Sequence, residues 1–488
     1  MSVKKIKPKL TPVMASVTVL TCMLGMSEQV LADPFPYGLQ DPLQTQPEVL
    51  KRRNMFLGDE TALACAASNS DAQHGLQTPL LLTTAVDLAM CQSPQVRAAW
   101  AAIKVQAGAL GEARAAYVPA VNGTMSKLRN STSYSDAATP DSTNRGITKY
   151  ANLNWRLFDF GTRSANLESA NHMLSAAMAS HDAAVQKMLN SVVAAYFDVM
   201  TAQATHKARQ EAVELAMGTW QATQRRETKG VAASSDILQA GAALAKAKLA
   251  LSRAQGDVQK TQSVLLYTMG SSMGRQLILP DEAEPKPELN KQDLNQWLID
   301  AQQLHPAIHA ARAQFLASQA KVRAVQAEGL PSLDYTQNFY QNGYPNQGLL
   351  PTSSTVTTVG LTLNVPLFEG FARTYKVRGA QAQSEQSEAQ LRDAELQVLM
   401  EVVKAHADTL SSIENLQTSY LLLEAANASR QSSQKRYDNG VADVLELLST
   451  QNALADAQQE RVRCLAEWRS ANLRLLASTG MMYRTHLK

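Results

Sequence analysis

The strongest constraint on this fold is an internal duplication that covers most of the 488 residues. Residues 93–99 (SPQVRAA) resemble residues 305–311 (HPAIHAA) at an offset of 212. Five further matches follow in register at an offset of 212 or 210: Pro119 with Pro331, Leu157-Phe158-Asp159 with Leu367-Phe368-Glu369, Arg163 with Arg373, Arg226 with Arg436, and Gly230-Val231-Ala232 with Gly440-Val441-Ala442. Landmarks repeated in one register indicate two copies of one structural unit. We therefore expect two similar halves, residues 83–270 and 295–480.

Each half combines a helix with strands. An Ala-rich helix is expected over about 83–117 and again over 295–329, and each ends at the matched proline. Beyond it, apolar and polar residues alternate with the period of a two-faced strand. The apolar positions are Ala151, Leu153, Trp155 and Leu157, then Leu333, Tyr335 and Phe339, and then Val359, Leu361, Leu363, Val365 and Leu367. Two strands per half make four, whereas spanning barrels need about eight. If the strands span a membrane, several chains must share one barrel.

Long helices are expected after the strands. No proline occurs from residue 141 to 279 or from 367 to the C-terminus, and apolar residues recur on one helical stripe. A helix from Thr162 to Thr228 would have about 67 residues and a length of roughly 100 Å at ~1.5 Å per residue. Helices of this length require coiled-coil-like partners.

Glycines mark the ends of these helices. Gly230 and Gly440 follow them, and a second helix is expected to return over about 234–268 and 444–478. The 23 Gly and 18 Pro together are sparse, and charged residues make up 18%, against about 25% in ordinary soluble domains. This composition favours long helices and disfavours an all-β or disordered chain.

The N-terminus has the layout of a secretory signal peptide over residues 1–32. Lys4 to Lys9 form a basic region, an apolar stretch follows, and small residues precede Asp33. A lipoprotein alternative would use Cys22, but Thr21 stands where a smaller residue is usual. The signal carries four Lys and one Glu, so the remainder has 42 basic and 42 acidic side chains. A neutral mature chain gives no electrostatic case for nucleic-acid binding.

Export also changes how the cysteines are interpreted. In an oxidising compartment, Cys65 and Cys91 could close a loop worth roughly 3 kcal/mol, and the alternative is two free thiols. The bridge would attach an N-terminal extension, residues 33–82, to the first helix. Cys464 lies in a helical pattern and is expected to be a small buried residue.

These features together resemble the TolC family of outer-membrane factors. The most specific pieces are the duplication, the LFDFG and PLFEG strand exits at residues 157–161 and 366–370, and the two Gly-Val-Ala turns. The resemblance implies a mainly α fold with a small β part, assembled as a homotrimer. Its twelve strands would form one outer-membrane barrel, continued by an α-helical barrel through the periplasm. A linker at 271–294 would join the repeats, and residues 481–488 would form a tail.

The resemblance also assigns roles at the helical turns. They would form the periplasmic tips, where the channel is closed at rest and an adaptor docks. The expected docking residues are Gly230, Val231, Ala232, Gly440, Val441 and Ala442, and the expected gate residues are Asp236, Tyr437 and Glu446. Tyr437 would tie the closed tip by a hydrogen bond directed toward Asp236. Ala442 stands where the family has an arginine, so one closing contact is missing or relocated.

The acids and glycines of the tips also have ordinary structural explanations. Asp236 and Glu446 would form rings of three carboxylates in a trimer and so favour cations. As first-turn acids they would alternatively stabilise the helix dipole. Ser449 stands where a second family acid is expected, which argues against a doubled acidic constriction. Gly230 and Gly440 are equally suited to be left-handed helix caps.

The sequence contains no enzyme signature and predicts no cofactor or metal. His305 and His309 are spaced i, i+4 without a third ligand. The favoured function is a passive exit duct for type I protein secretion, and the alternative is the outer-membrane channel of a drug or metal efflux pump. Both imply a periplasmic adaptor, an inner-membrane transporter and outer-membrane lipid as partners. A periplasmic structural coiled coil without pore activity is the alternative of another class, and the amphipathic strands argue against it.

Overall fold

The computed structural model describes residues 41–47, 79–133, 135–136, 141–271, 277–280, 293–343 and 354–480. The expected signal peptide, the C-terminal tail, most of the N-terminal extension and most of the linker lie outside these ranges. No helix among the described residues is both long enough and apolar enough to cross a membrane.

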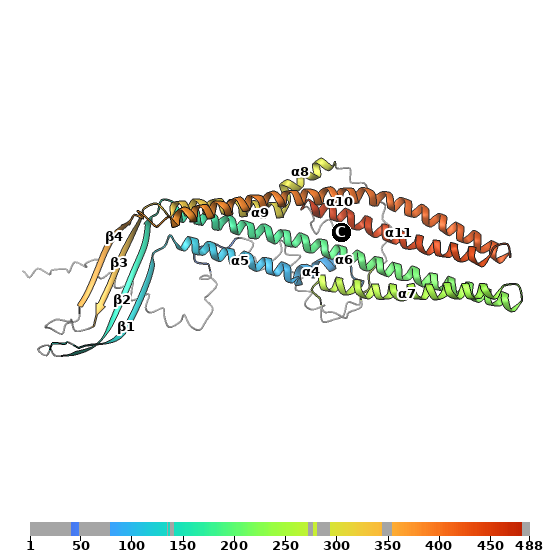
Figure 1. Ribbon diagram of the computed structural model, residues 1–488, viewed down its shortest axis with the longest axis horizontal. Coiled ribbons are helices and arrows are strands. Elements are labelled where there is room, and N and C mark those ends of the chain that lie inside the picture. The colour runs from blue at the N-terminus through green and yellow to red at the C-terminus, as the bar shows by residue number, and fades with distance from the viewer. Residues whose placement is uncertain are drawn as a thin grey trace, which may run out of the picture.

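The two halves repeat one order of elements, which confirms the duplication (Figure 1). The first half contains α4 (Leu82–Gln92), α5 (Pro94–Ala115), β1 (Ala120–Thr132), β2 (Ser142–Phe158), α6 (Thr162–Thr228) and α7 (Ser234–Thr268). The second half contains α8 (Leu294–Leu304), α9 (Pro306–Ala327), β3 (Ser332–Asn342), β4 (Ser354–Asn364), α10 (Ala372–Asp438) and α11 (Val444–Ser478). Equivalent helices have equal lengths of 11, 22, 67 and 35 residues.

The prediction of one continuous helix at the start of each half is wrong. The chain breaks at Ser93, between α4 and α5, and at His305, between α8 and α9. Both residues precede a proline and have ψ near 120°, at 120° and 121°. A proline ring disfavours helical conformation in the residue before it, and its missing N–H is tolerated at the first position of a helix. Each proline therefore ends one helix and begins the next.

The strands form one antiparallel sheet in the order β1-β2-β3-β4, so β1 and β4 are its open edges. On the face that carries Leu153, Trp155 and Leu361, the side chains are mainly apolar toward the helical end of the sheet, as the alternation predicted. The alternation had also predicted that the last strand continues to Leu367, but β4 ends at Asn364. Pro366 lacks the N–H that a strand pairing requires, which explains the earlier end.

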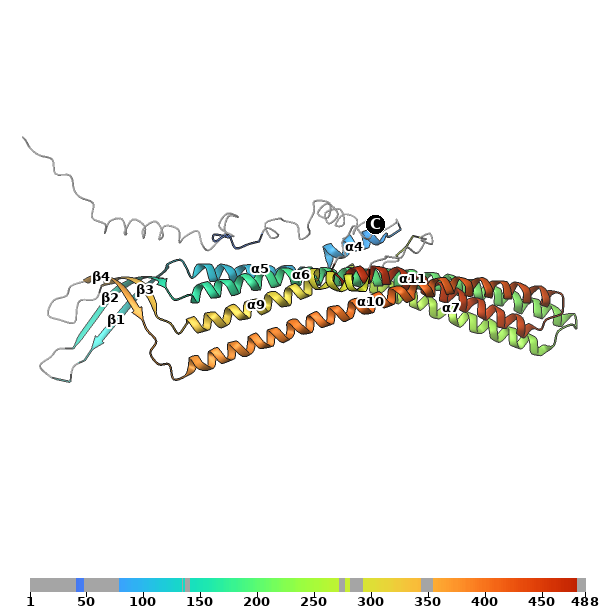
Figure 2. The same ribbon diagram turned by 90° about the horizontal axis from the view of Figure 1, so that it is seen from above.

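The molecule is elongated, with the sheet at one end and the turns α6–α7 and α10–α11 at the other (Figures 1 and 2). Nearest the sheet, the helices lie side by side in the order α5-α6-α9-α10. Farther away, α7 pairs with α6 and α11 pairs with α10. The two halves therefore extend along the whole molecule as neighbours instead of forming successive domains.

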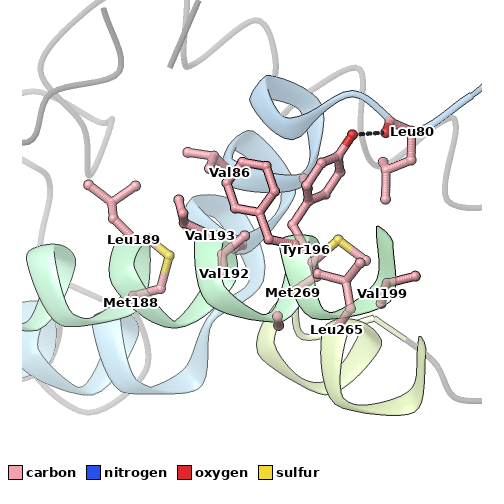
Figure 3. Close-up of a cluster of buried hydrophobic side chains, with 14 of the residues drawn as sticks. Leu80, Val86, Met188, Leu189, Val192, Val193, Tyr196, Val199, Leu265 and Met269 are labelled. Carbon is pink, nitrogen blue, oxygen red and sulfur yellow. Dashed lines mark hydrogen bonds between the residues drawn. The ribbon is translucent and has the colours of Figure 1, made fainter. Parts of the chain in front are cut away.

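The largest core cluster lies midway along the molecule, where α4 crosses α6 and the end of α7 (Figure 3). Tyr196 is fully buried there, and its hydroxyl donates a hydrogen bond to the Leu80 carbonyl oxygen over 2.9 Å. The Leu80 N–H in turn donates to the carbonyl oxygen of Ile278. These bonds satisfy polar groups that would otherwise be buried without partners, and they hold the segment before α4 onto the long helix.

A glycine completes this middle region in each half. Gly270 follows α7 and Gly480 follows α11, with φ of 71° and 78°. A Cβ at Gly270 would lie 2.9 Å from the carbonyl oxygen of Gln92, and one at Gly480 would lie 3.1 Å from that of Leu304. Each return helix thus ends directly against the helix break of its own half. We refer to these two contacts as the glycine joints.

Candidate functional site at the helical tips

Both tips have the same backbone geometry. Gly230 and Gly440 have φ of 74° and 75°, as expected for left-handed caps. The N–H of Val231 donates to the carbonyl oxygen of Arg226 over 3.0 Å, and the N–H of Val441 donates to that of Arg436 over 2.9 Å. This is the Schellman arrangement, in which a glycine allows the chain to turn back while satisfying the last carbonyls of the helix.

The tight caps leave the residues after each glycine facing solvent. Val231 is 72% exposed and Val441 is 70% exposed. Both side chains are therefore free to contact another surface at the end of the coiled coil. The tip geometry is thus compatible with a docking role for both Gly-Val-Ala turns.

Tyr437 links the two coils of one subunit. Its side chain, on α10, is 5% exposed, and its hydroxyl lies 3.0 Å from the Thr223 hydroxyl on α6. The guanidinium of Arg226 stacks over the Tyr437 ring at 4.4 Å from the ring centre. Tyr437 therefore makes its hydrogen bond to Thr223 and not, as expected from the sequence, to Asp236. We refer to Thr223, Arg226 and Tyr437 as the tip latch.

A second contact between α6 and the α10–α11 pair lies about two helical turns after the start of α11. The side-chain amide of Gln451 donates to the Thr219 hydroxyl over 2.8 Å. Thr219 and Thr223 are one helical turn apart on α6, and both are buried. The latch and this amide contact together hold the end of α6 against the α10–α11 pair.

Glu446 is neutralised within its own subunit. It accepts hydrogen bonds from Arg436 Nη1 at 2.8 Å and from the Ser433 hydroxyl at 3.0 Å. Its side chain is 35% exposed, so the carboxylate remains near solvent while paired with a cation. A ring of such pairs would have a much weaker field than the free carboxylates considered from the sequence.

Asp236 caps its own helix. Its carboxylate accepts weak contacts of 3.4 Å from the Ala233 N–H and from the Ser235 hydroxyl at the start of α7. It is the acidic residue in the first turn of that helix. This is the arrangement expected for an acid that stabilises a helix N-terminus, and the structure does not bring Asp236 to Tyr437.

Sequence reasoning missed several members of this site: Thr219, Thr223, Arg226, Arg436 and Gln451. The duplication had aligned Arg226 with Arg436, which could have identified both as tip residues. Their partners could not be inferred, because Thr223 and Tyr437 are 214 positions apart. The two equivalent arginines also act differently, one across the coils and one beside Glu446.

Cysteines and histidines elsewhere form no chemical site among the described residues. Cys91 is disulfide-bonded, while Cys65 lies outside those residues, so the pairing of the two stays a prediction. Cys464 is buried, and burial raises the pKa of its thiol. His305 accepts from the Ala307 N–H, and His309 contacts the Gln303 carbonyl oxygen. In the described ranges, no group of three potential ligands is placed to hold a metal ion.

A duplicated chain with a small amphipathic sheet at one end of paired 67-residue helices defines the class of outer-membrane channels with a long helical extension. The profile of the family described as "Outer membrane efflux protein" matches residues 85–271 and again 297–481, and the chain belongs to this family. The family is one of channels, and it confirms the predicted fold and the predicted place in the outer membrane with an extension into the periplasm.

Individual relatives agree with this family. The chain is 35% identical to Protein CyaE of Bordetella pertussis over 407 residues, covering 83% of this chain and 85% of CyaE. It is 23% identical to the alkaline protease secretion protein AprF of Pseudomonas aeruginosa over 317 residues, covering 62% and 63%. The solved outer membrane protein VceC of Vibrio cholerae shares the fold with a TM-score of 0.70 and 22% identity, covering 82% of this chain and 96% of that one.

Proposed function

We propose that the protein is a passive outer-membrane exit duct that acts as a homotrimer, and that it serves type I protein secretion. The observation that carries the proposal is a pair of matched open edges. The sheet ends in β1 and β4, and the helical layer beside it ends in α5 and α10. Because β1 continues from α5 and β4 leads into α10, one contact with the next copy covers both edges. Three copies supply twelve strands, enough for a barrel.

The polar face of the sheet supports passage of a polypeptide. One row of polar residues runs across the four strands and consists of Asn122, Asn152, Asn338 and Thr358. Asn338 accepts hydrogen bonds from Asn152 and from Tyr150, so the row is already partly ordered. The charged residues described on this face, Arg156 and Asp334, form a bidentate ion pair. A lumen of amides and hydroxyls would neither select charge nor retain apolar segments.

At the other end, the tip latch would hold the periplasmic entrance closed, and the Gly-Val-Ala turns would receive a periplasmic adaptor. The inner-membrane transporter that joins this adaptor would supply the energy. The duct itself would require no cofactor and catalyse no reaction. Efflux of small molecules by a tripartite pump is the second candidate, favoured by the description of the family as outer membrane efflux proteins, whereas the similarity to the alkaline protease secretion protein AprF favours secretion.

Single-channel recording in planar bilayers tests the duct. The purified detergent-solubilised protein should give discrete conductance steps and the mass of a trimer in light scattering. A protein that gives no pores and stays soluble without detergent would instead be a periplasmic coiled coil. Deleting the gene separates the two transport classes: retention of a large protein inside the cell supports secretion, and greater drug sensitivity with normal protein export supports efflux.

The aperture role of the tip acids has its own test. If Glu446 lines the entrance, Glu446→Gln should leave Arg436 unpaired and weaken blockade of the pore by multivalent cations. Asp236→Asn is the matched comparison, because this acid caps its helix without a cation. Unchanged blockade in Glu446→Gln would remove Glu446 from the aperture.

A further inference from the structure

The far end of the β1–β2 hairpin changes character along one face. Near the helices, the side chains of this face are apolar, with Val121 opposite Leu153. From the level of Met125 outward the same face becomes mainly basic, with Ile147 as an apolar exception, and it carries exposed Lys127, Arg129, Arg145 and Lys149. We refer to these four residues as the basic cluster. A face that is apolar toward the helical end and cationic toward the free end of the hairpin suits the boundary between lipid tails and headgroups.

The register places two of these cations against each other. Arg129 lies directly opposite Arg145, an arrangement that destabilises an isolated antiparallel pair. None of the four forms an ion pair with an acid in the described part of the chain. The repulsion would be relieved by an anion bound between the two strands, and a guanidinium binds phosphate oxygens with paired hydrogen bonds.

The depth of the Arg129–Arg145 pair matches one leaflet boundary. Trp155 lies on the same face near the helical end of β2, with Tyr335 opposite it, as in the aromatic girdles of membrane barrels. From Trp155 to Arg145 the strand runs roughly 34 Å at ~3.4 Å per residue. At a tilt of ~40° this is about 26 Å along a barrel axis, close to the ~25 Å apolar band of outer-membrane barrels. The arginine pair therefore reaches the headgroup level farthest from the helices.

The second hairpin lacks this feature. β3 and β4 contain no lysine or arginine, and both are shorter than their counterparts in the first half. The Arg129–Arg145 end of the first hairpin also extends past the last β2–β3 pair, Thr148 with Asn342. A trimer would thus have three separate basic clusters, one on each subunit.

We propose that Lys127, Arg129, Arg145 and Lys149 form a binding site for the phosphate groups of the glycolipid in the outer leaflet of the outer membrane. This proposal rests on the proposed function, because the cluster reaches that leaflet only if the sheet is part of a spanning barrel. The lipid phosphates would neutralise the opposed arginines, and the apolar part of the same face would contact the acyl chains. The site would fix the depth of the barrel in the membrane.

Binding of bisphosphorylated lipid A to the full-length trimer in detergent micelles tests the proposal. Arg129→Gln/Arg145→Gln should weaken binding at least tenfold. The matched control Lys248→Gln/Arg253→Gln removes two exposed cations from α7 and should bind as the wild type does. Lys127→Gln/Lys149→Gln keeps the opposed arginines and should lose less affinity, which still tests the site if the arginine variant does not assemble.

Three comparisons identify the ligand, and each can overturn the proposal. Dephosphorylated lipid A should bind the wild type weakly, and equal binding would exclude phosphate recognition. Millimolar inorganic phosphate should not displace lipid A, and displacement would indicate a general anion site. Phosphatidylglycerol should bind less tightly, and equal affinity would indicate any anionic lipid. Pore conductance is recorded in parallel: unchanged pores without lipid A binding contradict only this site, whereas no pores contradict the duct.

Discussion

The two repeats of this protein agree in their helices and differ in their hairpins. All four helices of one repeat have the same length as their counterparts, whereas β1 and β2 have 13 and 17 residues and β3 and β4 have 11 each. Helices that share one layer must end at the same levels to keep their turns and joints aligned. The helices have equal lengths because they pack against one another. The hairpins differ in length because their free ends have no such neighbour, so their side chains can differ between the repeats.

The same distinction holds at single positions where a strand enters a long helix. Arg163 of the first repeat pairs with the Asp159 carboxylate at 3.0 Å and stacks on Tyr117 at 4.6 Å. Its guanidinium also donates to the backbone carbonyl oxygens of Ala116, Arg156 and Leu157. Both members of the ion pair are largely buried.

The equivalent Arg373 of the second repeat has fewer contacts. It pairs with Glu369 at 2.7 Å, and the Glu369 side chain is about half exposed. At the position equivalent to Tyr117 the second repeat has Gly329, and a Cβ there would overlap the Arg373 guanidinium. The arginine thus lies against bare backbone instead of an aromatic ring.

The largest expected effect comes from removing these two arginines separately. Arg163→Ala should destabilise the start of α6 by about 3 kcal/mol, because it leaves a largely buried carboxylate without its cation and several backbone carbonyls without a side-chain donor. Arg373→Ala should cost about 1 kcal/mol at the start of α10, as for an exposed pair. Hydrogen exchange of the backbone amides in each first turn measures both. Equal losses of protection would mean that the contacts of Arg163 do not distinguish the repeats.

A second prediction compares two glycines with similar φ in the first repeat. Gly270→Ala should cost about 2 kcal/mol or more, because a Cβ must occupy a left-handed conformation and also displace the Gln92 carbonyl 2.9 Å away. Gly230→Ala should cost only about 1 kcal/mol for the conformation, since no atom of the described residues lies within 4 Å of its Cβ position. The protection of the last turn of α7 and of α6, respectively, reports the difference. A larger loss in Gly230→Ala would contradict the packing of the glycine joint.

The tip latch joins the repeats and should have a smaller effect. Thr223→Val removes the partner of the Tyr437 hydroxyl and should cost about 1 kcal/mol per subunit. The open fraction of the pore should then rise about fivefold for each latch that acts independently. Thr201→Val is the matched control on the same helix, because its hydroxyl bonds only to the Phe197 carbonyl among the described residues. A rise of the same size in Thr201→Val would show that the latch does not govern opening.

The smallest effect concerns pH at the helix breaks. Burial, and secondarily the charge of His309, lower the pKa of His305 below its usual value of 6.5. The neutral form is thus favoured in the folded state, where Nδ1 accepts from Ala307. This stabilisation, at most about 1 kcal/mol as for an N-cap, is present above pH 6.5 and is lost as the pH falls through the lowered pKa.

The first repeat provides the comparison for His305, since it has Ser93 at the equivalent break. Exchange protection of the first turn of α9 should decrease between pH 7 and pH 5, after correction for the intrinsic exchange rate. His305→Ser should remove this decrease, and the first turn of α5 should show none in either protein. A decrease that persists in His305→Ser would assign the pH dependence to another group.

The sequence predicted most of the helical architecture, because the signals for it are local. The bounds of α6, α7 and α11 follow from long stretches without proline and from Gly230 and Gly440, and all of these signals are visible in the sequence alone. The breaks at Ser93 and His305 were missed because the helical pattern continues across them, although each is followed by a proline. Their position relative to Gly270 and Gly480 depends on packing between segments far apart in the chain.

The candidate site was predicted only in part. Tyr437, Glu446 and Asp236 were identified, but their partners were not, because the contacts join two coils whose rotation about their axes a sequence does not specify. Thr223 carries no signal of its own on a long polar helix. Arg436 was aligned with Arg226, yet one pairs with an acid and the other with an aromatic ring. The duplication predicts that two residues occupy equivalent positions, but the residues around each position determine which contacts its side chain makes.

The glycine joints also determine how a force would travel through the molecule. A force applied at a helical turn is carried by two helices, the long helix and its return helix. The return helix ends at the middle of the molecule, where its glycine lies against Gln92 or Leu304 and passes part of the load to the helix break. The half of α6 and α10 nearest the sheet then carries only the remainder. A partner that pulls on the turns would therefore strain the half of the molecule between the turns and the glycine joints more than the half nearest the sheet.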